Sequence, residues 1–186
     1  DNFKRISLYE CFIYWDPWKT KEYHKTGLKN VLYMPFCTIA ENRFAPTLKK
    51  YQINFVATWR SKREATVSPV KNLGLFIWGN KAWQESSLSK NYQWGPVRVP
   101  EMIKIMRSSK ITLNVHSLEK TYSEGTNVRT FEATGAGGFL LVNKRKSLYD
   151  LFKVGKEIEV FDSAEELVAK TRFYLIGRVR FYDNKK

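Results

Sequence analysis

Residues 111–142 read ITLNVHSLEKTYSEGTNVRTFEATGAGGFLLV, and this stretch decides the fold. Its first five residues, Ile111–Val115, are mostly apolar or β-branched, as in a strand, and the sequence becomes polar at Asn114 and His116. Its end, Phe139–Val142, is a short continuous apolar run, which is typical of a strand covered on both faces. The stretch therefore predicts a strand, a polar loop, a short helix, a Gly-rich turn and a second strand.

The alternation of strands and helices continues on both sides of this stretch. In chain order, the patterns predict a strand at 11–15, a helix from Asp16-Pro17 to about residue 26, a strand at 30–34, a strand at 53–57, a helix at 62–72, a strand at 73–78, a helix at 100–109, and then, after residue 142, a helix at 147–152, a strand at 157–161 and a helix at 163–175. This order predicts an α/β fold: a Rossmann-like parallel sheet with helices on both faces.

The chain divides into three parts on these patterns. Residues 1–35 form a strand–helix–strand segment, which is the remnant of a preceding domain or an N-terminal unit. Residues 36–50 have no hydrophobic period and read as a linker. Residues 51–186 hold the main α/β domain.

Composition narrows the function classes. Of the 186 residues, 43% are hydrophobic, which is enough for a folded core, and no apolar run approaches the ~20 residues of a membrane span. Cys11 and Cys37 are too few for a disulfide framework or a zinc site, and we expect two buried free thiols. Free thiols and the lack of a signal peptide at the start favour a cytoplasmic protein.

The net charge is the strongest compositional feature: 32 basic residues face 18 acidic ones, for +14. Such a charge indicates an anionic partner. Three interpretations stay open: a solvated basic surface, an anionic membrane or glycan to which the protein binds peripherally, and nucleic acid. Nucleic acid is the least favoured, because no Arg-rich arm, zinc-finger spacing or RNA-binding aromatic signature accompanies the charge.

The loops that follow the strands should meet at one edge of the sheet. Ligands of parallel α/β sheets bind at the carboxyl ends of the strands, near the switch point. This places five polar side chains near one cleft: Arg60, Arg63, His116, Asn127 and Arg129. The chain has neither a GxGxxG sequence after its first strand nor a P-loop, so an NAD site or an NTPase site is poorly supported.

Residues 124–132, EGTNVRTFE, carry the chemistry. Thr126 or Asn127 can cap the following helix, and Gly125 lets a ligand approach the backbone. A helix N-terminus suits a diphosphate, and Arg129 adds a planar fork of donors for phosphate oxygens. Glu132 lies further along the helix, where its carboxylate can accept hydrogen bonds from the vicinal hydroxyls of a ribose.

Each of these residues also has a plain structural interpretation. Glu132 alone can be a solvated helical acid, Arg129 can pair with Glu132 or Glu124, and His116 can be a structural histidine. The glycines of the following turn most simply allow close packing between helix and strand. A ligand site is favoured because all of these residues occur together between two buried strands.

Several segments together resemble a known family. Residues 111–142, with Glu124 and Glu132 spaced as E-x7-E, resemble the donor-binding segment of GT-B glycosyltransferases. More specifically, the chain is similar to the CgeB-like (spore maturation protein) family. The matching segments are VLYMPF at 31–36, INFVATWRSKRE at 53–64, LFIWGNKAW at 75–83, SSKITLNVH at 108–116, NVRTFEATGAGGFLLV at 127–142 and GKEIEVFDSAEELVAKTRFYL at 155–175.

The resemblance implies a role for most of the candidate residues. Glu132 would hold the nucleotide ribose, and Asn127 and Arg129 would face the diphosphate or the donor sugar. Arg63 would reach the phosphates. Trp94 and Gly95 would lie by the base, and Glu124 would lie near the donor sugar. Glu124 and Arg129 are the predicted catalytic residues. The predicted binding residues are Arg60, Arg63, Trp94, Gly95, His116, Gly125, Thr126, Asn127 and Glu132.

The implied activity is the transfer of a sugar from a UDP- or GDP-linked donor to a glycan, protein or lipid acceptor, without a metal. A GT-B enzyme has two such domains, and this chain has room for the C-terminal, donor-binding half, so an acceptor domain or partner subunit is expected. Two alternatives remain: a catalytically silent module of the same fold that binds a nucleotide or another anion, and a basic nucleic-acid-binding protein.

Overall fold

The computed structural model describes residues 2–38, 47–116 and 125–177. The N-terminal unit consists of α1 (Asn2–Ile6), β1 (Phe12–Tyr14), α2 (Pro17–Lys25) and β2 (Val31–Tyr33). The core domain consists, in chain order, of β3 (Tyr51–Val56), α3 (Ser61–Val67), η1 (Ser68–Val70), β4 (Leu75–Trp78), η2 (Lys81–Glu85), η3 (Ser89–Asn91), β5 (Tyr92–Trp94), α4 (Val99–Arg107), β6 (Ser109–Asn114), α5 (Val128–Gly135), β7 (Leu140–Asn143), α6 (Lys146–Leu151), β8 (Glu159–Phe161) and α7 (Ala164–Ile176).

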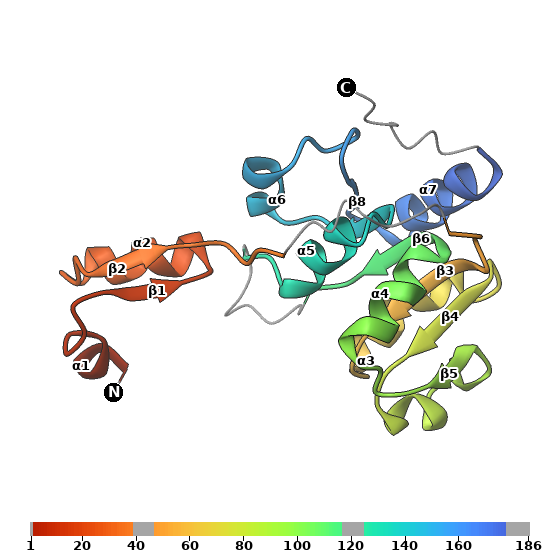
Figure 1. Ribbon diagram of the computed structural model, residues 1–186, viewed down its shortest axis with the longest axis horizontal. Helices are drawn as coiled ribbons and strands as arrows, with labels where there is room; N and C mark the ends of the chain where they lie inside the picture. The colour runs from red at the N-terminus through yellow and green to blue at the C-terminus, as the bar shows by residue number, and fades with distance from the viewer. Residues whose placement is uncertain (1, 39–46, 117–124, 178–186) are drawn as a thin grey trace.

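The core sheet has six strands in the order β5-β4-β3-β6-β7-β8, and every neighbouring pair is parallel. Within the core domain, the chain enters the middle of the sheet at β3 and adds β4 and β5 on one side. It then returns through α4 to β6, on the other side of β3, and adds β7 and β8 outward (Figure 1). The switch point therefore lies between β3 and β6. The predicted Rossmann-like parallel sheet with helices on both faces is confirmed.

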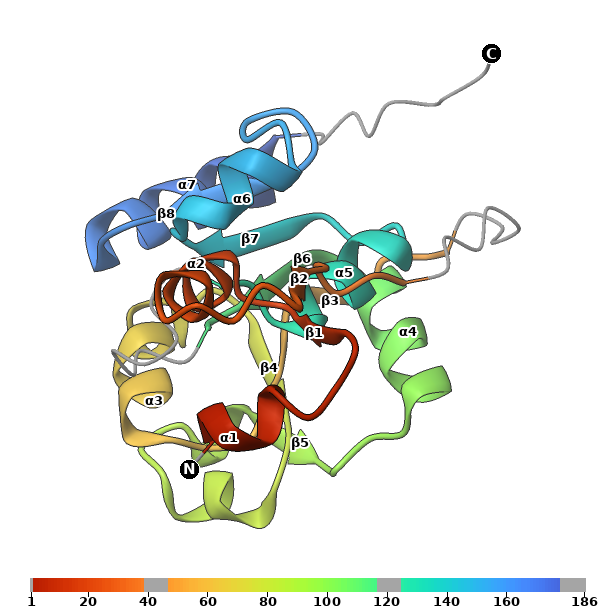
Figure 2. The same cartoon turned by 90° about the vertical axis from the view of Figure 1, so that its left-hand side faces the viewer.

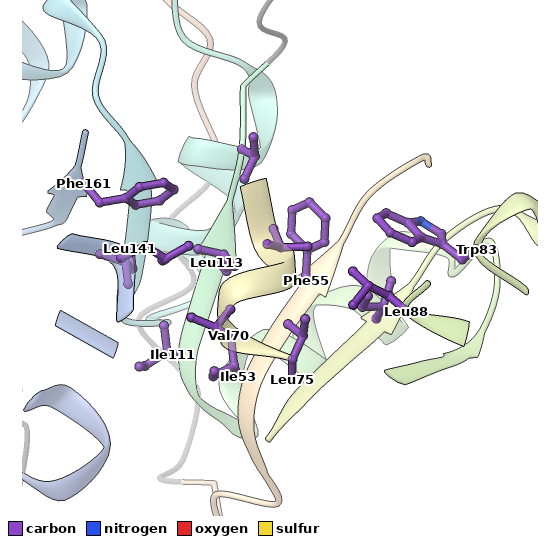
Figure 3. Packing of buried hydrophobic residues seen from close by; sticks show 14 residues of the cluster. Ile53, Phe55, Val70, Leu75, Trp83, Leu88, Ile111, Leu113, Leu141 and Phe161 are labelled. Atoms are coloured by element: carbon purple, nitrogen blue, oxygen red, sulfur yellow. The ribbon is translucent and has the colours of Figure 1, made fainter. Parts of the chain in front are cut away.

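One face of the sheet packs against α3, η1 and α7. Alternate residues of the central strands, such as Ile53 and Phe55 on β3, point into this layer and are almost fully buried. Figure 3 shows how Leu113, Leu141 and Phe161 continue the layer toward β8. At its other end Trp83 is fully buried, and its Nε1–H donates to the carbonyl oxygen of Ala57 at 2.8 Å. A large indole can be buried here because its polar atom has a partner.

The other face packs against α4, α5 and α6. The apolar stripe of α4 buries Met102, Ile105 and Met106, and α5 and α6 bury Ala133 and Leu148. Since β7 faces helices on both sides, all four of its residues are buried, as its continuous apolar run predicted.

One predicted helix needs correction, and one strand was not predicted. The helix expected over residues 62–72 is α-helical only to Val67 and continues as the 3-10 turn η1, because Pro69 has no N–H for an α-helical hydrogen bond. The polar segment 81–96 contains the edge strand β5, which its pattern did not indicate. β5 has three residues, and its register against β4 shifts between Ile77 and Trp78, so it lacks the alternation of a longer strand.

The N-terminal unit is a small parallel βαβ structure with its own cluster of Ile6, Tyr23 and Val31. Asp16 caps α2 by accepting hydrogen bonds from the amides of Trp18 and Lys19, which confirms the predicted start of this helix. The unit lies on the side toward which the strands of the core sheet point (Figure 1) and stands in front of the core in Figure 2. The predicted linker, residues 36–50, is described only at 36–38 and 47–50.

Two compositional predictions can now be compared with the structure. Cys11 and Cys37 are free thiols, but both are exposed rather than buried, because they lie outside the packed faces of the strands. Within the described ranges, no helix has both the length and the apolar composition needed to cross a bilayer.

Candidate functional site

The N-terminus of α5 lies at the carboxyl end of β6, beside the switch point. Asn127 is its cap: its backbone is extended and its Oδ1 accepts the amide of Thr130 at 3.2 Å. Asn114, the last residue of β6, donates from Nδ2 to Asn127 Oδ1 at 2.9 Å and to Thr130 Oγ1 at 3.1 Å. The cap is therefore tied to the sheet by buried side chains, which fixes the direction of the helix.

His116 follows β6 and is 2% exposed. Asn143 Oδ1, at the end of β7, accepts the backbone N–H of His116 at 2.7 Å and lies 3.0 Å from its ring Nδ1. Because this oxygen can only accept, the ring carries its proton on Nδ1. The other ring nitrogen, Nε2, lies 3.3 Å from Thr130 Oγ1. Asn143, His116 and Thr130 thus form a continuous polar contact from β7 to α5.

Burial lowers the pKa of His116 from 6.5 to about 4. The hydrogen bond to Asn143 raises this pKa and the positive charges of Arg145 and Arg63 lower it, but burial is the largest effect. His116 is consequently neutral at physiological pH. In this structure it joins β7 to α5 and does not reach solvent.

Arg129 and Glu132 form an ion pair one turn into α5. Arg129 Nη1 lies 2.7 Å from Glu132 Oε2 and also contacts Met102 Sδ of α4. Their side chains are 25% and 21% exposed, so the pair is partly open to solvent. One of the plain interpretations of Arg129, pairing with Glu132, describes its contact in this structure.

Arg60 and Arg63 belong to the loop and first turn after β3. Arg60 occupies the N-cap position of α3 with an extended backbone, and its side chain is exposed. Arg63 donates from Nη1 to the carbonyl oxygen of Thr58 at 3.0 Å. Arg63 follows β3 and His116 follows the neighbouring strand β6, and the charge of Arg63 lowers the pKa of His116, so these two residues lie near each other at the carboxyl edge.

Trp94 and Gly95 lie at the end of β5, two strands away from β3. The side chain of Trp94 is 51% exposed. Gly95 has a φ of +152° and packs so tightly on Gly79, at the end of β4, that an added Cβ would lie 2.6 Å from the carbonyl oxygen of Gly79. These two residues share the carboxyl edge with His116 and Asn127 but are not part of their hydrogen-bond network.

The N-terminal unit reaches the same edge. An added Cβ on Gly125 would lie 2.7 Å from Asp16 Oδ2, so the start of α2 packs closely against the turn before α5, and a side chain at position 125 would displace Asp16. Lys146 of α6 lies 4.2 Å from the centre of the Trp18 ring, a cation–π contact between the unit and the core. Thr126, between Gly125 and the cap, is buried.

Three residues of this edge were missing from the sequence prediction: Asn114, Thr130 and Asn143. Asn114 and Asn143 are the last residues of two buried parallel strands, and an amide at the end of an apolar run is the signal that could have identified them. Thr130 gave no such signal, because threonine at an inner helical position is commonplace.

Glu124 lies outside the described residues. No group of three His, Cys, Asp or Glu side chains with the spacing of a metal site occurs in the part of the chain that the structure describes.

Chemically, the described edge offers a helix N-terminus, the guanidinium groups of Arg60, Arg63 and Arg129, and the carboxylate of Glu132. Such a set can bind an anion at the helix end and hydroxyl groups beside it.

Comparisons with known proteins bear on the family and the fold. A family described as "Glycosyl transferase-like" matches residues 60–179. No curated protein matches the chain.

Several solved structures share the fold at low sequence identity. A TarM mutant of S. aureus in complex with Fondaparinux, alpha-GlcNAc-glycerol and UDP matches with a TM-score of 0.68 and 12% identity, over 94% of this chain and 38% of that one. Sucrose-phosphate synthase from Thermosynechococcus elongatus matches with a TM-score of 0.61 and 12% identity, over 92% and 51%. The lipopolysaccharide outer core galactosyltransferase WaaB matches with a TM-score of 0.61 and 12% identity, over 91% and 54%.

The fold is therefore that of the GT-B glycosyltransferases, and the chain spans about half or less of the length of these structures.

Proposed function

The chain belongs to the glycosyl transferase-like family, and on this premise we propose that its sheet edge binds a nucleoside diphosphate sugar and serves sugar transfer to a glycan, protein or lipid acceptor. We propose a UDP- or GDP-linked donor and no metal. Within the GT-B enzymes, we assign the chain to the CgeB-like group on the motifs at 108–142 and 155–175.

One observation carries the proposal: the capped N-terminus of α5 stands at the switch point with Glu132 on the same helix. Asn127 and Asn114 hold the first turn, whose amides point out of the helix end, toward the place where a diphosphate would lie. Glu132, five residues after the cap, would accept the vicinal hydroxyls of the ribose. The fixed cap means that the amides of the first turn need little rearrangement when the donor binds.

Donor binding would separate the ion pair of Arg129 and Glu132. The two side chains are one-fifth to one-quarter exposed, so each can turn toward a ligand without unfolding its surroundings. Arg129 would exchange the carboxylate for phosphate oxygens, and Glu132 would exchange the guanidinium for hydroxyl groups. In transfer, Arg129 and the helix amides would stabilise the departing diphosphate.

The remaining predicted residues are assigned around this centre. Arg60 and Arg63, which follow β3, would add positive charge for the phosphates. Trp94 has an exposed ring that could stack on the base, and Gly95 lies beside it. Glu124 is assigned to the donor sugar through its spacing from Glu132.

We propose that the acceptor side is built from the N-terminal unit together with a domain or subunit outside this chain. The unit already touches the turn before α5 through Asp16, so a wall placed on it would face the donor. A general base for an inverting reaction would come from that wall.

The test is thermal stabilisation by nucleotides. UDP or GDP should raise the melting temperature of the chain, because a ligand that binds only the folded state stabilises it. Glu132→Ala should remove most of this rise while the protein stays folded. Glu101→Ala, which removes an exposed acid on α4, is the matched control and should behave like the wild type. Equal stabilisation of the Glu132→Ala protein would overturn the ribose assignment.

A binding module without activity of its own is the second candidate. It is favoured by the fraction of the related structures that the chain spans, between 38% and 54% in the three comparisons. Release of sugar from a UDP- or GDP-linked donor by the chain alone would support the enzyme. Nucleotide binding without any release or transfer would support the module.

A further inference from the structure

A pocket of about 580 Å³ opens at the carboxyl ends of β7 and β8, on the α3 and α7 side of the sheet. It is lined by the first turns of α3 and α7 and by the turns that follow the two strands. None of the residues assigned to the donor lines it. The pocket is therefore a separate feature of the same edge.

The lining is positively charged and rich in donors. Lys62 comes from α3, and Lys144 and Arg145 come from the turn after β7, against the single carboxylate of Asp162. Asn143 also lines the pocket. Its Oδ1 is engaged by His116, which leaves its Nδ2 amide hydrogens on the opposite side of the group. Cations and amide donors converging from separate segments suit an anion with several acceptor oxygens.

Each acidic group at or near the pocket is engaged by a hydrogen bond or an ion pair. Lys144 Nζ and Asp162 Oδ2 lie 3.0 Å apart, and both side chains are at least half exposed at the rim. Glu166 of α7 accepts the amide of Asp162 at 2.7 Å and pairs with Lys170 at 2.8 Å, so the charge of its carboxylate is offset by Lys170. The Glu165 carboxyl group bonds to its own amide and to Ser163, and these bonds lower its pKa. The carboxylates of α7 therefore do not neutralise the excess positive charge of the lining.

The pocket adjoins the donor side through one residue. Asn143 borders the pocket, and His116, bonded to Asn143, contacts Thr130 of α5. A group in the pocket and a donor at α5 would therefore lie on either side of a rigid, buried polar contact. Sugar transfer requires an acceptor next to the donor.

We propose that this pocket binds a phosphate ester group carried by the acceptor. Only the identification of the bound molecule as the acceptor rests on the proposed function. Binding of phosphate by the pocket does not depend on it, because this binding can be measured without any transfer reaction. Phosphate fits the donor set better than a neutral glycan does, since two lysines and an arginine in one pocket favour a dianion. The acceptor class is accordingly a phosphorylated glycan, polyol or lipid.

The experiment is calorimetric titration of the chain with glycerol 3-phosphate, with glycerol as the uncharged probe. Glycerol 3-phosphate should bind in the presence and in the absence of saturating UDP, and glycerol should not bind. Lys62→Gln should weaken the binding roughly tenfold, because one charge-assisted contact is lost. Lys81→Gln, which removes an exposed lysine of η2, is the matched control and should change nothing.

The outcomes separate this proposal from the donor site. Competition between UDP and glycerol 3-phosphate would overturn the proposal, because the pocket would then be part of the donor's own diphosphate site. Equal affinity of the wild type and Lys62→Gln proteins would overturn it as well. If neither UDP nor GDP binds but the Lys62-dependent binding of glycerol 3-phosphate persists, the donor assignment fails and the phosphate pocket is supported.

Discussion

The buried histidine makes the stability of this protein depend on pH in a defined way. His116 has a pKa of about 4 in the folded chain, because burial disfavours its charged form, and an ordinary value near 6.5 when unfolded. Between these two values the unfolded chain binds a proton that the folded chain does not. The contribution of neutral His116 is therefore fully present above pH 6.5 and is lost as the pH falls toward 4.

The size of this loss follows from the two pKa values. The full difference corresponds to about 3 kcal/mol, and lowering the pH from 7.5 to 5 removes about 2 kcal/mol of it. The substitution His116→Asn removes the titrating group and retains a side-chain N–H that can donate to Asn143, as ring Nδ1 does.

Urea unfolding of both proteins at several pH values gives the measurement. The free energy of unfolding of the wild type minus that of His116→Asn should fall by about 2 kcal/mol from pH 7.5 to pH 5. Because other titrating groups are common to both proteins, they cancel in this difference. A difference that stays constant over this range, or an NMR titration of the His116 ring with a midpoint near 6.5, would refute the reasoning.

Two further substitutions test the packing. Gly79→Ala would place a Cβ 2.1 Å from the carbonyl oxygen of Ala57 and 2.8 Å from Trp83 Nε1, so it should destabilise the fold by about 1–3 kcal/mol, and an unchanged urea midpoint would contradict the packing of β4 on β3. Ser163→Ala removes the side chain that caps α7 by accepting the amide of Glu166 at 3.1 Å; urea unfolding should show a loss of about 1 kcal/mol, and no loss would mean that the cap is replaced by water.

The sequence was sufficient to predict the sheet and most of its helices. The strong signals were continuous apolar runs, such as Phe139–Val142, and caps with a specific chemistry, such as Asp16 followed by Pro17 and Ser163 followed by Glu166. These signals are local, and the structure obeys them because each buried run leaves few other ways to hide its apolar side chains. β5 was missed because an edge strand of three residues, 51% exposed at Trp94, has little to bury.

The site was predicted less completely than the fold. Proximity of the loops after β3 and β6 followed from topology, and the influence of Arg63 on His116 agrees with it. The hydrogen bond that the His116 amide donates to Asn143 joins residues 27 positions apart in the chain. No pattern in either segment predicts a particular partner at that separation. The orientation of Arg129 toward Glu132 and Met102 likewise depends on the packing of α4 on α5.

The central position of β3 has a consequence for the order in which the protein folds. β3 pairs with β4, the next strand in the chain, but its second neighbour is β6, where Tyr51 is matched with Ser109. During synthesis, one edge of β3 therefore stays without its partner until some sixty further residues have left the ribosome. Pairings between distant segments form slowly, and apolar strand edges that wait for them are prone to misassembly. Expression should consequently benefit from chaperones that hold the nascent β3–β4 segment until residues 109–114 arrive.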